Sequence, residues 1–178
     1  MPETKFFIMM IVIYFIFIAG VGLVTHVFHA LGLVTIARRR GIQRPNLAWL
    51  PVIGVSYIMG YIADDYDIVT QGNDRHLRSW LLGLSTFLVA LEPVLIVMMF
   101  TSRVFEQDSP PLGFMVVLLL MLVAGIPFTV LHYVALFKLF RSCQPSNSVA
   151  FLALAIFLSI TPFLIFIVRH RDEGMTTD

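Results

Sequence analysis

The chain has 178 residues, of which 58% are hydrophobic and only 13% are charged, and its 12 Lys and Arg nearly balance its 11 Asp and Glu. Soluble domains carry about a quarter charged residues, so this composition excludes a soluble globular domain and a disordered chain. A single cysteine excludes a disulfide scaffold, and a net charge of +1 excludes a basic nucleic-acid-binding protein. We therefore expect an integral membrane protein, with the lipid bilayer as its first partner and no nucleic-acid partner.

Three apolar blocks are long enough to cross the hydrocarbon core as helices, which takes roughly 20 residues. They are Phe6–Ala37, Trp80–Phe100 and Leu112–Phe137. The first block has no formally charged residue and is longer than the apolar region of a cleavable signal peptide. We therefore predict that it is retained as a membrane helix.

Two further apolar blocks are interrupted by proline. Asn46–Ala63 contains Pro51, and Val149–Val168 is divided by Thr161-Pro162. Because proline breaks or kinks a helix, each block is either a full span or a helical hairpin that enters and leaves the membrane on one side.

The placement of Lys and Arg favours the hairpins, since these residues concentrate in cytoplasmic loops. Five spans would divide the basic residues almost evenly between the two sides, whereas two hairpins leave only Lys5 and Arg103 on the outer side. We predict an all-α polytopic membrane protein, a single membrane domain over 1–178, with three full transmembrane helices and two Pro-broken re-entrant or interfacial hairpins. Five transmembrane helices are the alternative.

Two stretches of the chain share the same spacing of glycine, polar residue, histidine and arginine. Their members are Gly22, His26, His29 and Arg38 in the first half, and Gly125, Thr129, His132 and Arg141 in the second. The pattern is either a weak internal repeat of 6–67 and 112–174 or a coincidence in a sequence dominated by a few apolar residue types. A real repeat requires the first and last long helices to run parallel, which the hairpin topology provides.

Glu92 lies near the middle of the second long apolar block. A carboxylate at that depth costs at least about 2.5 kcal/mol, so we expect Glu92 to face protein and to be paired or protonated. At about 1.5 Å per residue, His26 lies roughly 18 Å from Arg38 and Glu92 roughly 20 Å from Arg78. Glu92 is thus predicted to meet His26, either as a proton or cation site or as a structural contact between helices.

His29 and His132 are expected in one layer below that pair, each about 13 Å from the arginine that follows it. Thr25 and Thr129 lie on the same helix faces, where polar residues hydrogen-bond between membrane helices. Histidines with a glutamate are the residue types that bind Zn²⁺, but the chain has neither HExxH nor a cysteine pair. We therefore favour hydrogen-bonding roles and predict no metal and no cofactor.

Charged residues and the cysteine are expected near the cytoplasmic surface. We predict that four arginines fix the topology and contact anionic headgroups, and that three aspartates form a solvated acidic loop rather than a cation-binding turn. Cys143 is expected as a free thiol in a cytoplasmic loop. The arginines are Arg38, Arg39, Arg40 and Arg44, and the aspartates are Asp64, Asp65 and Asp67.

The segment Thr35–Val52 carries a basic run, then Gly41, Pro45 and the sequence LAWLPV. It resembles an uncharacterised family of small multi-pass membrane proteins of Gram-positive bacteria, which carry a basic–Gly–x–Pro–LAW-x-PV element after their first helix. Ala135–Asn147 and the later Asp172–Met175 are similar to the same family. The resemblance implies a bacterial cytoplasmic membrane and a shared fold, and it transfers no catalytic or binding residue.

No enzyme signature is found, neither GxSxG nor a phosphate-binding glycine loop. We therefore expect a non-enzymatic protein that acts through helix contacts, as an accessory or scaffold subunit or as a homo-oligomer. The alternative is a small oligomeric transporter or channel in which Glu92 and the three intramembrane histidines relay protons or a cation, because Pro-broken segments in two corresponding halves are typical of transport sites. An intramembrane enzyme for lipid-linked substrates is a third reading.

Overall fold

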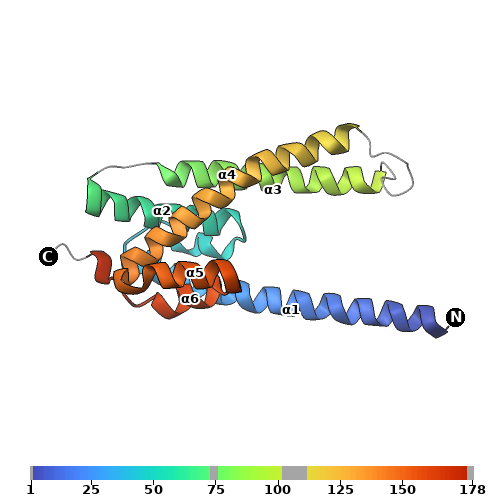
Figure 1. The fold of residues 1–178 in the computed structure, drawn as a ribbon, viewed down its shortest axis with the longest axis horizontal. Coiled ribbons are helices and arrows are strands. Elements are labelled where there is room, and N and C mark those ends of the chain that lie inside the picture. The colour runs from blue at the N-terminus through green and yellow to red at the C-terminus, as the bar shows by residue number, and fades with distance from the viewer. Residues whose placement is uncertain (1, 73–75, 102–111, 176–178) are drawn as a thin grey trace.

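The computed structural model describes residues 2–72, 76–101 and 112–175, and all regular elements in these ranges are helices (Figure 1). The α-helices are α1 (Pro2–Arg39), α2 (Ile53–Gln71), α3 (Leu77–Thr101), α4 (Leu112–Cys143), α5 (Ser148–Leu158) and α6 (Thr161–Val168). Three short 3₁₀-helices accompany them: η1 (Pro45–Trp49), η2 (Pro145–Asn147) and η3 (Glu173–Met175).

Three helices are long and apolar enough to cross a membrane, over Met9–Arg39, Leu77–Phe100 and Leu112–Cys143. This confirms the predicted multi-pass, all-α fold with three spans. The alternative with five spans is wrong, because α2 carries three aspartates and the second broken block is divided into helices of 11 and 8 residues.

Both Pro-broken blocks form hairpins that return to the end they left. In Figure 1, α1 and α4 run in the same direction toward the end where the short helices and the C-terminal segment gather, and α3 runs away from it. We call this end the base; it holds α2, α5, α6, the 3₁₀-helices and the adjoining ends of the three spans. The parallel course of α1 and α4 is the one that an internal repeat requires.

Close approach of backbones holds the base together, as is usual for membrane helices. A methyl group at Gly60 would come within 2.6 Å of the Cα of Arg78, so α2 and α3 touch there. A methyl group at Gly32 would meet Ile165 and the backbone of Phe166, so α6 lies directly against α1. The largest buried side chains gather around these contacts: Leu33, Ile36, Ile58, Ile62, Leu136, Phe140 and Ile165.

Away from the base, the spans have few neighbours. The most apolar part of α1 has no buried residue. In the most apolar parts of α3 and α4, only 11% and 6% of the residues are buried. Helices α3 and α4 pack along each other, whereas the N-terminal half of α1 extends apart from them (Figure 1). Most of the membrane-facing surface of this chain is therefore open to lipid or to other helices.

The turns of both hairpins have unusual backbone conformations. Val52 has φ 59° and ψ −69°, and around it the amide of Ile53 donates to the carbonyl of Pro51 at 2.7 Å, which closes a γ-turn. Ser159 has φ 53° and ends α5 in the left-handed conformation. Both turns reverse the chain within a few residues and send it back to the base.

Candidate functional site

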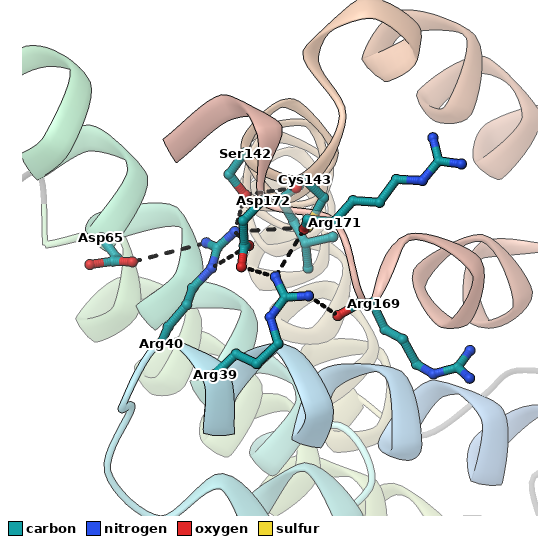
Figure 2. Close-up of polar contacts among 9 residues, drawn as sticks. Arg39, Arg40, Asp65, Ser142, Cys143, Arg169, Arg171 and Asp172 are labelled. Atoms are coloured by element: carbon teal, nitrogen blue, oxygen red, sulfur yellow. Dashed lines mark hydrogen bonds and ion pairs between the residues drawn. The ribbon is translucent and has the colours of Figure 1, made fainter. Parts of the chain in front are cut away.

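Arg40 lies at the centre of a polar cluster where the ends of α1 and α4 meet the C-terminal segment (Figure 2). Its side chain is 5% exposed, and its Nη2 lies 2.9 Å from Asp172 Oδ1 and 2.9 Å from Ser142 Oγ. Asp65 of α2 approaches its Nη1 at 4.0 Å. Burial lowers the pKa of the Arg40 guanidinium, an influence that the Asp65 carboxylate opposes.

Arg39 binds the same carboxylate from the other side. It forms an ion pair with Asp172 and donates hydrogen bonds to the carbonyls of Arg169 at 3.0 Å and Arg171 at 3.2 Å. In Figure 2 the two guanidinium groups converge on Asp172, while the side chain of Arg171 points away from it. Arg39 and Arg40 are thus engaged within the chain, because Asp172 is folded back against them. Their contact with anionic headgroups stays a prediction.

Arg38 and Arg44 are exposed at the base. Arg38 donates a hydrogen bond to Asn46 Oδ1 at 3.0 Å, and Arg44 stands at the start of η1 with φ 56°. For these two residues, contact with anionic headgroups stays a prediction.

The three aspartates do not form a solvated loop, so that prediction is wrong. They lie in the last turns of α2, which continues to Gln71 and ends at Gly72. Asp67 is fully buried and its Oδ2 lies 2.5 Å from Nζ of Lys138 on α4. Asp64 accepts hydrogen bonds from the amides of Leu77 and Arg78 at 2.9 and 3.1 Å, and so caps the start of α3.

Ion pairs therefore connect the two halves of the chain crosswise. Asp172 of the second half binds Arg39 and Arg40 of the first, and Asp67 of the first half binds Lys138 of the second. Asp67 lies in the last turns of the helix that returns from the first hairpin, and Asp172 follows the second hairpin. The basic residues lie at or near the ends of the long helices α1 and α4. This arrangement locks both hairpins to the opposite half of the base.

His26 stabilises the first hairpin. Its Nε2 donates to the carbonyl oxygen of Trp49 at 3.0 Å, next to the turn of that hairpin. Irregular backbone at membrane depth is tolerated only where protein satisfies it. His26 therefore has a structural role in this chain, with a backbone carbonyl as its partner in place of the predicted Glu92.

His29 on α1 and His132 on α4 are half-buried. Within the described ranges, Nε2 of His29 and Nδ1 of His132 are buried and have no hydrogen-bond partner. Each of these two histidines thus keeps one buried ring nitrogen that no described residue satisfies.

Thr25 and Thr129 bond within their own helices. Thr25 donates to the carbonyls of Val21 and Gly22 at 3.0 and 2.9 Å, and Thr129 donates to that of Gly125 at 2.8 Å. Neither hydroxyl donates to another helix among these contacts. These hydrogen bonds within the helix satisfy the two hydroxyl groups inside the membrane. Neither threonine bonds to one of the three histidines in these contacts.

Glu92 is exposed on α3 and has no polar partner among the residues that the structure describes. The predicted pair with His26 does not form, because α3 packs on α2 and α4 whereas α1 packs on α6, η1 and α2. At 100° per residue, Glu92 falls on the same side of α3 as Leu81 and Ser85, which are buried. Glu92 lies on the same face as these two residues but farther from the base, where no other helix that the structure describes buries it.

The described residues hold no group of three His, Cys, Asp or Glu side chains placed to bind a metal ion. Cys143 is a buried free thiol in the last turn of α4, not in a loop, and its Sγ lies 3.8 Å from Arg40 Nη2. The sequence analysis missed Asp172 and Lys138 as binding partners. Their signal was present, since each half of the chain has an acidic residue after its hairpin and basic residues ending its long helix.

Comparison of the chain with protein-family models, with curated proteins and with solved structures finds no match. The resemblance to a family of Gram-positive membrane proteins therefore stays a prediction.

Proposed function

We propose that this protein is a non-enzymatic subunit of a membrane assembly, and that it holds a neighbouring membrane helix through the surface of α3 around Glu92. The observation that carries this proposal is the position of Glu92, exposed near the middle of an apolar span and without a polar partner among the described residues. A helix from a second copy or from another membrane protein supplies the missing partner.

The energetics favour such a partner over lipid. A carboxyl group at the bilayer centre costs at least about 2.5 kcal/mol, and polar contacts between membrane helices return part of that cost. The base supports this role because its crosswise ion pairs hold the ends of α1 and α4, and Asp64 caps the start of α3 there. The spans then present their open surface to the neighbour in a fixed geometry.

Replacing Glu92 tests the assembly. We expect Glu92→Leu to shift the protein in nanodiscs or mild detergent to the mass of a single chain, measured by native mass spectrometry, while Glu92→Gln keeps part of the assembly because an amide still hydrogen-bonds. Val94→Leu, on the same exposed helix, is the control and should leave the mass unchanged. An unchanged assembly in Glu92→Leu, with an unchanged melting temperature, contradicts the proposal.

We place the protein in a bacterial cytoplasmic membrane with its base in the cytoplasm. The sequence resemblance supports the bacterial membrane, and the gathering of basic residues at the base supports its orientation.

A second candidate is a small oligomeric proton or cation conduit. It is favoured by one observation, the two buried imidazole nitrogens of His29 and His132 that lack partners among the described residues. Liposome flux measurements separate the candidates: a conduit loses the pH dependence of its flux in Glu92→Gln and in His29→Gln but keeps it in His170→Gln at the base, whereas an assembly subunit shows no flux above empty liposomes.

A further inference from the structure

The first hairpin reaches deep along α1. Its turn follows Trp49, whose carbonyl is bound by His26 at 3.0 Å. His26 precedes Arg38 by twelve residues, so at about 1.5 Å per residue this contact lies roughly 18 Å from the basic end of the span. With Arg38 at the headgroup level, the turn lies close to the middle of a hydrocarbon core that is about 30 Å thick.

The second hairpin reaches the same level by different contacts. The rings of Phe28 on α1 and Phe163 on α6 lie 5.1 Å apart, and Gly32 lies against Ile165. Phe28 is about 15 Å above Arg38, and the turn at Ser159 continues beyond Phe163 to about 20 Å. Figure 1 shows the two hairpins pointing the same way as the spans and ending at a similar level.

The turns of both hairpins carry exposed apolar side chains and no charge. Trp49, Leu50 and Val52 are exposed at the first, and Phe157 and Leu158 at the second, where Phe157 is 84% exposed. No charged residue occurs in 46–63 or 148–168. Four exposed basic side chains lie instead at the base, which is where we expect the headgroups: Arg38, Arg44, Arg141 and Arg171.

We propose that the two hairpins insert into the base-side leaflet as far as the bilayer centre, and that this one-sided wedge makes the protein accumulate in membranes that are convex on the base side. The partner of this surface is the acyl chains of one leaflet. The hairpins lie within the membrane and do not rest on its surface.

The wedge follows from the cross-section of the protein in each leaflet. The outer leaflet holds three helices, while the base-side leaflet holds these and the four segments η1, α2, α5 and α6. With a helix diameter of about 10–12 Å, four segments add roughly 300–450 Å² to that leaflet alone. Segments inserted into one leaflet favour a bilayer in which that leaflet is expanded, so their binding depends on curvature.

Tryptophan fluorescence measures the depth directly, because the chain has only Trp49 and Trp80. Trp80 lies near the base at the start of α3 and is 65% exposed, so it is the matched shallow probe. In Trp80→Phe, we expect Trp49 to be quenched most by lipids brominated near the end of the acyl chain. In Trp49→Phe, we expect Trp80 to be quenched most by lipids brominated near the headgroup. Equal, shallow quenching of both residues overturns the insertion.

Single-vesicle imaging tests the wedge. With the base on the outer surface, we expect the protein density to rise several-fold from large to small vesicles. Phe157→Lys, which charges an exposed turn without touching the core, should flatten this dependence, and Phe157→Leu should keep it. A density independent of vesicle size overturns the proposal.

The same sorting measurement in Glu92→Leu separates this inference from the proposed assembly. The wedge belongs to a single chain, so we expect the sorting to persist when the assembly is lost. Sorting that disappears together with the assembly contradicts the wedge and leaves the assembly role intact.

Discussion

Asp67 is the single residue whose loss should destabilise this protein most. Replacing it with Ala leaves the Lys138 ammonium largely buried without its partner, and breaking such a pair costs about 3 kcal/mol or more. Replacing both residues, as in Asp67→Leu with Lys138→Met, should recover most of that loss, because an apolar pair needs no ionic partner. Unfolding in mixed detergent micelles measures the difference, and a double variant as unstable as Asp67→Ala argues against the buried pair.

Asp172 should control how firmly the C-terminal segment is attached. It binds Arg39 and Arg40 together, so Asp172→Asn weakens both ion pairs at once. We expect hydrogen exchange in 169–175 to become at least several-fold faster. Arg171→Gln is the control, because Arg171 contributes its backbone carbonyl to Arg39 and its side chain points away from the cluster (Figure 2). Equal exchange in the two variants would show that Asp172 does not hold the segment.

At the scale of elements, the contact between α2 and α3 leaves no room for an added methyl group. A methyl group at Gly60 would meet the backbone of Arg78, and overpacking of this kind costs about 1–3 kcal/mol. Gly83 on α3 has open space around it, so Gly83→Ala should be neutral or stabilise the helix by up to about 1 kcal/mol. Thermal unfolding compares the two variants, and similar melting temperatures would refute the close approach.

The spans and the hairpins could be predicted from the sequence, because length, proline and basic residues act locally and carry the topology. The helical structure at the end of α2 could not be predicted from the sequence. Its three aspartates are weak helix formers that are typical of a loop. They are helical, and two of them are buried, because Lys138, Arg40 and the start of α3 satisfy them. These partners are distant in sequence or visible only after folding.

For the candidate site, too, only some of the features could be predicted from the sequence. The depth of Glu92 and His26 follows from counting residues along a helix, but their pairing depends on which helices pack together, and the sequence does not specify that. Helix α1 packs on α6 and the first hairpin, and so His26 binds the carbonyl of Trp49 instead. For His29 and His132 the sequence predicts a shared depth, because that needs only the number of residues to the following arginine and the parallel course of their helices.

At the scale of the whole molecule, the chain consists of a closely packed base and spans with an open surface. The base holds the crosswise ion pairs and the buried side chains, and the membrane-facing halves of the helices hold few contacts within the chain. Stability should therefore depend on residues of the base, and assembly on residues of the spans. The base can stabilise the chain, and the spans can bind a neighbour, only if each hairpin returns to the side of the membrane from which it entered.

Cysteine labelling tests that requirement most directly. In a Cys143→Ala background, Thr70→Cys and Met175→Cys probe the far end of each hairpin. Leu112→Cys probes the opposite side, because α4 has 32 residues and exceeds the hydrocarbon core. We expect a membrane-impermeant reagent to label positions 70 and 175 from one side and position 112 only from the other. Labelling of position 70 from the side that labels position 112 would contradict the account.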